Sequence, residues 1–467
     1  MYTFDILSAR QKVHFIGIGG VSMSGIAELL YRRGFQVTGS DSRHNKYISH
    51  LEAIGIPVVI GQGPENIQDQ DLFVYTDALL PTNTELLAAK QSGRPVFTRG
   101  QFLGALMKNF TYAIAVSGAH GKSTTTSMIS DILLRSKMDP TILIGGLLDD
   151  IGGNVMAGQD DIFVAEACEY KANILYYYPS IAIVLNIDAD HLDFYKNLDD
   201  IIHTFEKYME NLGPNGTAII NVDDPHNATL PDHVRGKVIT YGMENEKAMI
   251  FAENIHFDDR GCPIFDVRFP EGEKARVHLN ALGRFNVRNA LAAMIAAHEA
   301  GVSWDVAVKG VEDYRPLHRR MEEVGSFMGA KVYTDYGHHP AEIEVTLAAM
   351  AEHKTGKFYC VFEPYTLSRT RTLMEEFAGA FGSCDEAIIT KIMVAREVDD
   401  GTVRSEELVK KINQRGDRAV YQETYEDVAD YLEKVIQPRD MILTTGCGDA
   451  DQIANLLIKR NAEKQNQ

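Results

Sequence analysis

The sequence has few of the residues that mark disulfide-stabilised, membrane-spanning or nucleic-acid-binding proteins. Five cysteines are scattered over 467 residues without a Cys-x-x-Cys pair, so we expect neither a disulfide framework nor a cysteine zinc site. No apolar run is long enough to cross a bilayer, and the first residues lack a signal-peptide pattern. The 46 lysines and arginines are outnumbered by 65 aspartates and glutamates, and this charge balance argues against a nucleic-acid partner. We therefore expect a cytoplasmic protein with no membrane or nucleic-acid partner.

The chain is too long for one hydrophobic core, and its length suggests about three domains. Apolar β-branched runs alternate with helical patterns along most of it, which predicts parallel sheets covered by helices. The predicted fold is α/β. It has an N-terminal Rossmann-like domain (1–108), a central domain with a P-loop ATPase-type parallel sheet (109–315), and a C-terminal Rossmann-like doubly wound sheet (316–467).

The most informative motif lies between an apolar run at 112–116 and a helical pattern at 124–134. It reads Gly118-Ala119-His120-Gly121-Lys122-Ser123-Thr124. Glycines let backbone N–H groups approach phosphate oxygens, and a helix N-terminus adds donors and a favourable dipole. Lys122 would reach the outer phosphates and the Ser123 hydroxyl would bind Mg²⁺. Because Val116 stands where the general P-loop has glycine, a solvated turn is the alternative interpretation.

A second glycine-rich turn follows the first predicted strand. It reads Gly17-Ile18-Gly19-Gly20, and Asp41 follows the next strand, which is a dinucleotide-type arrangement. The glycine spacing departs from G-x-G-x-x-G, so the turn predicts a diphosphate ligand without specifying a dinucleotide. NAD binding and a tight turn without a ligand remain the alternatives.

Polar residues also end the next two predicted strands of the central domain, at 161–166 and 181–186. In open parallel sheets the ligand lies at the carboxyl ends of the strands, which places Glu166, Asn186, Asp190 and His191 near the phosphate loop. Glu166 and His191 are candidate partners of a cation beside phosphate, although Mg²⁺ prefers oxygen ligands. A surface acid and a structural imidazole are the alternatives.

The C-terminal region predicts strands at 331–334, 357–362, 386–390 and 441–444. Helices are expected at 341–352, 370–381, 405–412 and 450–457. Polar motifs follow the strands: Asp335-Tyr336-Gly337-His338-His339-Pro340, Glu363-Pro364-Tyr365, Arg369, and Gly446-Cys447-Gly448-Asp449.

Taken together, these motifs resemble those of the Mur ligases, the ATP-dependent amide ligases of peptidoglycan precursor synthesis. The resemblance is strongest to the branch that adds L-alanine. The matching segments occur in family order through the whole chain: 14–20 with 23–27, 118–126, Asn186 with Asp190-His191, Gly283 with Asn286 and Asn289 to Ala293, Arg319-Arg320, 335–340 and 368–371.

The resemblance implies a role for each motif. Gly17, Gly19, Gly20 and Ser24 would surround the diphosphate of UDP-N-acetylmuramate, with Asp41 on the ribose or uracil side. ATP would contact Gly118, His120, Gly121, Lys122, Ser123, Thr124, Asn286, Asn289, Arg320 and Asp335. Mg²⁺ would be held by Ser123, Glu166 and His191. The implied catalytic residues are Lys122, His191, Arg320, Asp335, His338, His339 and Arg369, of which His338 and Arg369 would also bind substrate.

The implied reaction phosphorylates the lactyl carboxylate and then lets the amine of L-alanine attack the acyl phosphate. Two departures from the alanine branch, Glu363 and Tyr365, lie on the acceptor side. Glycine, L-serine or a preformed peptide therefore remain alternative acceptors. A non-catalytic or NAD-linked Rossmann protein is a further alternative, but it leaves Lys122, Ser123 and Glu166 without a role.

Overall fold

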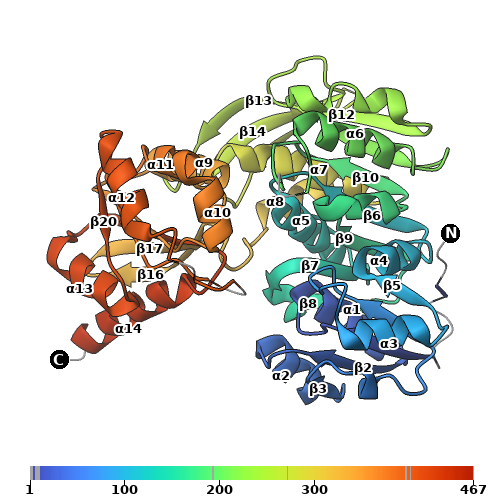
Figure 1. The fold of residues 1–467 in the computed structure, drawn as a ribbon. Coiled ribbons are helices and arrows are strands. Elements are labelled where there is room, and N and C mark those ends of the chain that lie inside the picture. The colour runs from blue at the N-terminus through green and yellow to red at the C-terminus, as the bar shows by residue number, and fades with distance from the viewer. Residues whose placement is uncertain are drawn as a thin grey trace. The chain divides into compact units, whose positions relative to one another are not determined.

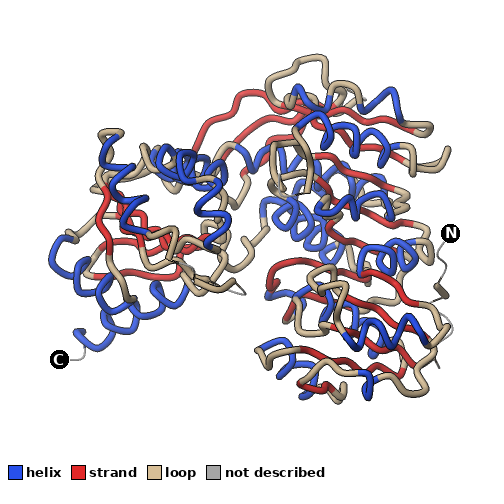
Figure 2. The backbone as a smooth tube through the Cα atoms, in the orientation of Figure 1, coloured by secondary structure: helices blue, strands red, loops and turns tan. Residues whose placement is uncertain are grey.

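The computed structural model describes residues 4–5, 11–191, 194–270, 272–394, 397–399 and 401–465. It contains three β-sheets flanked by helices (Figures 1 and 2), as the sequence predicts. The chain forms two compact units. The first comprises Met1–Ile255, Phe265–Leu279 and Val287–Tyr314, and the second His256–Ile264, Asn280–Asn286 and Arg315–Gln467.

The first sheet is fully parallel and has the strand order β3-β2-β1-β4-β5. This is the order of a dinucleotide-binding half in which the ligand site lies at the carboxyl ends of the central strands. Its elements are β1 (Lys12–Ile16), α1 (Val21–Arg32), β2 (Gln36–Asp41), α2 (Lys46–Ala53), β3 (Val58–Ile60), η1 (Pro64–Asn66), β4 (Leu72–Tyr75), α3 (Thr84–Gln91), β5 (Val96–Thr98) and α4 (Arg99–Met107).

The second sheet has ten strands in the order β15-β14-β13-β12-β11-β10-β6-β9-β7-β8. Sequence reasoning anticipated its central strands but not the antiparallel β7–β8 pair. Its strands are β6 (Tyr112–Ser117), β7 (Thr141–Leu148), β8 (Gly153–Met156), β9 (Ile162–Glu166), β10 (Ile181–Val184), β11 (Thr217–Asn221), β12 (Lys237–Gly242), β13 (Ile250–Phe257), β14 (Pro263–Arg268) and β15 (Lys274–His278). The helices that accompany it are α5 (Lys122–Arg135), η2 (Asp149–Ile151), η3 (Tyr170–Tyr176), α6 (Leu198–Met209), η4 (Pro225–Asn227), η5 (Leu230–His233), α7 (Phe285–Glu299) and α8 (Trp304–Glu312).

The third sheet has the order β16-β17-β21-β18-β19-β20, and only the β16–β17 pair is antiparallel. The predicted helix at 370–381 is instead two helices, α10 and α11, which meet at Leu373. The last helix continues past the predicted end at 457. The elements are β16 (Glu322–Phe327), β17 (Ala330–Asp335), α9 (Pro340–Ala351), β18 (Phe358–Phe362), α10 (Leu367–Thr372), α11 (Met374–Gly379), β19 (Glu386–Ile389), α12 (Ser405–Gln414), β20 (Ala419–Tyr421), α13 (Tyr425–Val435), β21 (Met441–Thr445) and α14 (Asp451–Gln465).

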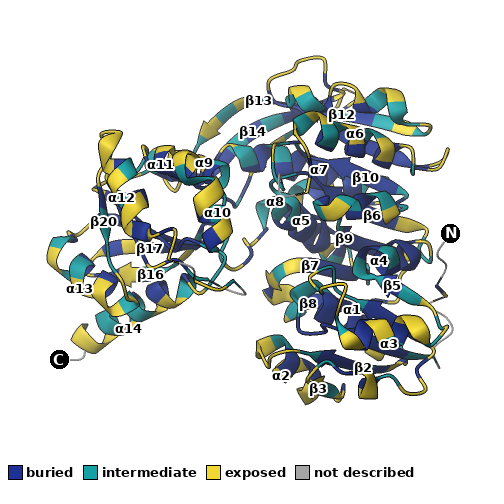
Figure 3. Cartoon of the chain, in the orientation of Figure 1, coloured by how far each residue is buried: buried dark blue, intermediate teal, exposed yellow. Residues whose placement is uncertain are grey.

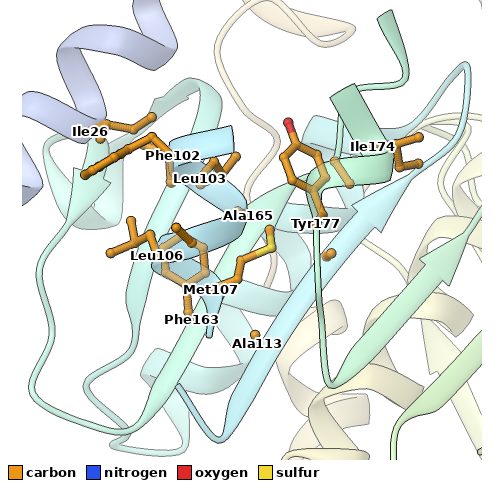
Figure 4. Close-up of a cluster of buried hydrophobic side chains, with 14 of the residues drawn as sticks. Ile26, Phe102, Leu103, Leu106, Met107, Ala113, Phe163, Ala165, Ile174 and Tyr177 are labelled. Carbon is orange, nitrogen blue, oxygen red and sulfur yellow. The ribbon is translucent and has the colours of Figure 1, made fainter. Parts of the chain in front are cut away.

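One continuous apolar core joins the first two sheets, and burial follows the sheet interiors (Figure 3). At its centre α4 packs Phe102 and Leu106 between α1, strands β6 and β9, and the segment that contains Tyr177 (Figure 4). The predicted boundary between residues 108 and 109 therefore lies inside the first compact unit. The domain limits remain a prediction.

Two separate apolar clusters cover the two faces of the third sheet. Among the described residues, no helix combines the length and the apolar character that a membrane span requires.

Candidate active site

The predicted phosphate loop joins β6 to α5, and its glycines are required by its shape. Gly118 and Gly121 have φ angles of 136° and 84°, a region that side-chain-bearing residues rarely adopt. A Cβ on Gly121 would lie 2.6 Å from Oδ1 of Asn289, and one on Gly118 would lie 3.0 Å from the Asn186 carbonyl oxygen. Only glycine therefore lets the loop turn this tightly against its neighbours.

Asn186 holds the loop from the end of the neighbouring strand β10. Its Oδ1 accepts a hydrogen bond from the His120 backbone N–H at 2.8 Å, and its Nδ2 donates to the His120 carbonyl at 3.0 Å. His120 Nε2 in turn lies 3.2 Å from Oδ2 of Asp188. The loop is thus fixed by side chains from the strand beside it, as expected at the carboxyl edge of a parallel sheet.

Lys122 begins α5 and forms an ion pair that the sequence did not predict. Its Nζ lies 3.2 Å from Oε1 of Glu169 and donates to the carbonyl oxygens of Gly118 and Ala119 at 2.5 and 3.1 Å. Burial alone would lower the pKa of Lys122, but the Glu169 carboxylate outweighs it and raises the pKa above its usual value. The lysine is therefore a fixed positive charge at the mouth of the loop.

Glu169 also belongs to the only described group of three metal-ligand side chains, which it forms with Asp190 and His191. The His191 Nε2 lies 3.8 Å from Glu169 Oε1 and 3.6 Å from Asp190 Oδ2. His191 has a φ of 57°, and strain of this kind often occurs at functional sites. Two carboxylates and an imidazole beside a phosphate loop can bind a divalent cation.

Glu166, the acid that sequence reasoning selected, lies at the end of β9, and its Oε1 accepts a hydrogen bond from the Gly145 N–H at 2.7 Å. It is outside the three-residue group. Glu169 lies three residues beyond the end of β9, so a prediction from strand ends alone does not include it. The sequence feature that could have identified Glu169 is its place as the second acid of the segment Glu166-Ala167-Cys168-Glu169.

The other predicted ATP residues of the first unit lie beside the loop. Ser123 is buried in the first turn of α5, and Thr124 follows it there. Asn289, on α7, reaches Gly121 as described above. Asn286 lies one helical turn earlier, in the part of α7 that belongs to the second unit, where its Nδ2 donates to the Leu282 carbonyl at 2.7 Å.

The glycine turn of the first sheet is held by Asp41 and Asn45. The Gly19 N–H donates to Asp41 Oδ2 at 2.9 Å, and Asn45 Nδ2 donates to the Gly19 carbonyl at 3.0 Å. Gly17 has a φ of 82°. Asp41 thus stabilises the turn through this hydrogen bond. Its contact with the ribose or uracil stays a prediction.

Gly20 is the extended N-cap residue of α1, and the first turn of this helix carries no acidic side chain and no side-chain cap. Ser24, in the same helix, donates its hydroxyl to the Val21 carbonyl at 3.0 Å. The N-terminus of α1 therefore presents backbone N–H groups and a positive dipole end to the turn, which suits a diphosphate.

In the second unit, Asp335 ends β17 and is buried. Its carboxylate accepts hydrogen bonds from the backbone N–H groups of Met321 (2.9 Å) and Gly337 (2.7 Å). Burial raises the pKa of Asp335, although Arg320 nearby opposes the rise. Arg320 stacks over the Tyr336 ring with 5.2 Å between the guanidinium carbon and the ring centroid. The predicted pair of Arg320 and Asp335 is thus brought together.

His338 lies near the charged side chains of Arg320, Arg369 and Glu342. Burial lowers the pKa of His338, and the cations Arg369 and Arg320 lower it further, while Glu342 opposes them. Its Nδ1 lies 3.5 Å from Glu342 Oε2, and the His339 N–H donates to the same oxygen at 3.2 Å. The surroundings of His338 therefore favour its neutral imidazole form.

Glu363 is one of the two residues expected to affect which amino acid is accepted. It is buried, and both of its carboxylate oxygens accept hydrogen bonds within the protein. Oε1 accepts from the Tyr425 hydroxyl at 2.5 Å and Oε2 from the Asp449 N–H at 2.8 Å. Burial raises the pKa of Glu363. This geometry favours a role in shaping the 446–449 turn over direct contact with an incoming amine.

Comparison with known proteins finds one family along most of the chain. The Mur ligase family catalytic domain matches residues 12–111, the Mur ligase middle domain 116–297, and the Mur ligase glutamate ligase domain 319–448. A UDP-N-acetylmuramate–L-alanine ligase from Clostridium acetobutylicum is 42% identical over 98% of this chain and 100% of its own. One from Acetivibrio thermocellus is 43% identical over 96% of each chain.

Solved structures give the same result. The UDP-N-acetylmuramate-alanine ligase of Thermotoga maritima superposes with a TM-score of 0.80 at 25% identity, covering 97% of this chain and 100% of that one. Family matches in all three sheets, full-length relatives and a phosphate loop with a paired lysine lead to one conclusion. The chain belongs to the Mur ligase family.

Proposed function

We infer that this protein is an ATP-dependent ligase that joins L-alanine to the lactyl carboxylate of UDP-N-acetylmuramate. The observation that carries this conclusion is the full-length similarity to ligases of that name, at 40–43% identity. The phosphate loop with Lys122 provides the ATP-binding feature that such a reaction needs. The uncapped N-terminus of α1 supports a sugar-nucleotide diphosphate in the same unit.

The chemistry follows from the electrophile. A carboxylate resists attack by an amine, so the γ-phosphoryl group of ATP is first transferred to one carboxylate oxygen, which gives an acyl phosphate and ADP. The amine nitrogen then attacks the acyl carbon, loses a proton, and phosphate leaves with that oxygen. Positioning and charge neutralisation carry most of the catalysis in such transfers. Lys122 stabilises the phosphoryl charge, while Arg320 and Arg369 are suited to anionic groups of the substrates.

For Mg²⁺ we propose a binding group of Glu169, Asp190 and His191, with the Ser123 hydroxyl nearby in the first turn of α5. The donor set fits, because it supplies two carboxylates that converge with an imidazole beside the phosphate loop. When bound, the cation would neutralise phosphate charge. The neutral His338 is suited to accept a proton from the attacking amine.

A matched pair of variants tests the metal assignment. Glu169→Gln should weaken Mn²⁺ binding, measured directly by electron paramagnetic resonance, by roughly 10-fold or more, whereas Glu166→Gln should change it by less than about 3-fold. Both variants keep the size of the side chain, so they differ in which carboxylate is lost. The reverse order would restore Glu166 as the ligand that the sequence suggested.

The acceptor is tested by competition. Mass spectrometry of the product from UDP-N-acetylmuramate, ATP and equimolar L-alanine, glycine and L-serine should show mainly the alanyl product. The buried bonds of Glu363 favour an unchanged order of preference in Glu363→Gln. A predominant glycyl or seryl product would overturn the assignment of L-alanine while leaving the ligase class intact.

A further inference from the structure

Arg99 has a charge that its described surroundings do not balance. It is the first residue of α4, only partly exposed, and forms no ion pair with any described carboxylate. Its Nη1 donates a long hydrogen bond of 3.5 Å to the Ser22 hydroxyl, and the Tyr177 hydroxyl is a second hydrogen-bonding neighbour. A cation removed from water without a partner is costly, so its retention points to an anionic ligand.

Its other described neighbours form no ion pair with it. Tyr177 lies close to the guanidinium, but burial raises the pKa of Tyr177 to about 12, so its hydroxyl is neutral at neutral pH. Asp77 is near enough to favour the charge of Arg99, but its Oδ2 accepts a hydrogen bond from Asn173 at 3.0 Å and it forms no ion pair with Arg99. The charge of Arg99 is therefore available to a ligand.

The position of Arg99 narrows the identity of that ligand. On one side it contacts Ser22, in the first turn of α1, where the diphosphate is expected. On the other side is the segment 168–177, which is seated on the N-terminal half of α4. A Cβ on Gly100 would lie 2.2 Å from Asn173 Oδ1, and one on Gly104 would lie 1.8 Å from the Tyr176 carbonyl oxygen.

Figure 4 shows the same arrangement, with the Tyr177 ring beside α4 and its oxygen pointing away from the apolar side chains. The segment 168–177 also carries Glu169, the partner of Lys122. Cys168 is close enough to both cations that each opposes the rise of its pKa. Arg99 thus lies between the N-terminus of α1 and the lysine of the phosphate loop, all within the first compact unit.

The local backbone is built to hold this segment in place. Lys171 and Ala172 both have a φ of 54°, which costs roughly 1–2 kcal/mol for each residue with a side chain. Lys171 Nζ donates to the Asp77 carbonyl at 2.7 Å, and this bond ties the strained turn to the end of the first sheet. This bond helps to hold the segment that carries Cys168 and Glu169.

The charges near Lys122 favour a carboxylate as the ligand of Arg99. The reacting acid must approach Lys122, whose charge is already paired with Glu169. Arg99 supplies a further cation, without an ion pair to any described carboxylate, in the same unit, and the planar guanidinium fork matches a carboxylate bidentately. Resting on the proposed function, we propose that Arg99 binds the lactyl carboxylate of the sugar nucleotide and positions it for phosphorylation.

The test compares two sugar nucleotides that share the uridine diphosphate and differ in the lactyl group. In Arg99→Gln, calorimetry should show UDP-N-acetylmuramate binding weakened about 30-fold or more, because a charged pair in a partly buried site is lost. Binding of UDP-N-acetylglucosamine should change by less than about 3-fold. Lys90→Gln, which removes an exposed charge from helix α3 of the same unit, should change neither.

Equal weakening of both ligands would place Arg99 on the diphosphate and overturn the proposal, and no weakening of either would also overturn it. Arg99→Lys keeps the charge and loses the fork, so it should give an intermediate loss confined to UDP-N-acetylmuramate, and it serves if Arg99→Gln does not fold. Failure of the proposed function has a different signature. The wild-type protein would then discriminate between the two sugar nucleotides without forming ADP in response to L-alanine.

Discussion

At the scale of single residues, the ion pair of Lys122 and Glu169 links the phosphate loop to the candidate metal-binding group. The lysine was predictable, because glycines, a lysine and a hydroxyl residue between a strand and a helix form a local pattern. Its partner was not, since Glu169 lies 47 positions away and is brought there by the pairing of β9 with β6. The same pairing places Glu166 at the carboxyl end of β9, where its carboxylate accepts a hydrogen bond from the Gly145 N–H. Local patterns thus identify candidate residues, while tertiary pairing decides which of two nearby acids meets the lysine.

Replacing Lys122 separates the two ligand sites. Lys122→Ala should lower ligation by roughly 10³-fold, because an electrostatic contact to the transferred phosphoryl group is lost. UDP-N-acetylmuramate binding should change by less than about 3-fold, because the glycine turn of the first sheet supplies its own donors. Rate assays and calorimetry on the same preparation provide both values. Loss of sugar-nucleotide binding by a folded variant would contradict the separation.

A stability control accompanies this variant. Lys122→Ala leaves the buried Glu169 carboxylate without its cation and should lower the free energy of unfolding by about 1–3 kcal/mol. The double variant Lys122→Ala/Glu169→Gln should recover part of that loss, since the neutral amide is cheaper to bury. If thermal unfolding shows no recovery, the ion pair does not account for the destabilisation.

At the scale of elements, the βα turns carry the function. The turn after β1 and the turn after β6 each place a helix N-terminus at the carboxyl edge of a parallel sheet, and both were predictable from glycine spacing. The antiparallel pairs β7–β8 and β16–β17 were not anticipated, because the edge strands β8 and β16 show little alternation. The helix break at Leu373 was also missed, since the sequence there contains neither proline nor glycine.

The turn before α5 should tolerate no side chain at Gly121. Gly121→Ala would force a left-handed backbone and meet Asn289 Oδ1, so we expect a loss of roughly 1–3 kcal/mol in unfolding free energy and an increase of about 10-fold or more in the KM for ATP. Gly153→Ala is the matched control, because its Cβ would meet nothing within 4 Å. Equal behaviour of the two variants in thermal unfolding and ATP titration would show that the tight turn is dispensable.

The whole molecule combines three sheets, and the order of motifs along the chain was enough to predict their class. What the sequence could not give is the division into compact units. The first two sheets share one apolar core, and the segments 256–264 and 280–286 belong to the second unit although they are distant in sequence from its main part. Such divisions arise from contacts between remote apolar residues, which leave no local signal.

The account rests on transfer of phosphate to the substrate carboxylate before amide formation, and isotope labelling tests this step directly. UDP-N-acetylmuramate labelled with ¹⁸O in the lactyl carboxylate is incubated with ATP and L-alanine, and the inorganic phosphate and the product are analysed by mass spectrometry. Because phosphate leaves with the carboxylate oxygen that it bonded, the account predicts one ¹⁸O atom in each phosphate released and an alanyl amide that retains the other. Phosphate free of ¹⁸O, or labelled phosphate without an L-alanine-dependent product, would contradict it.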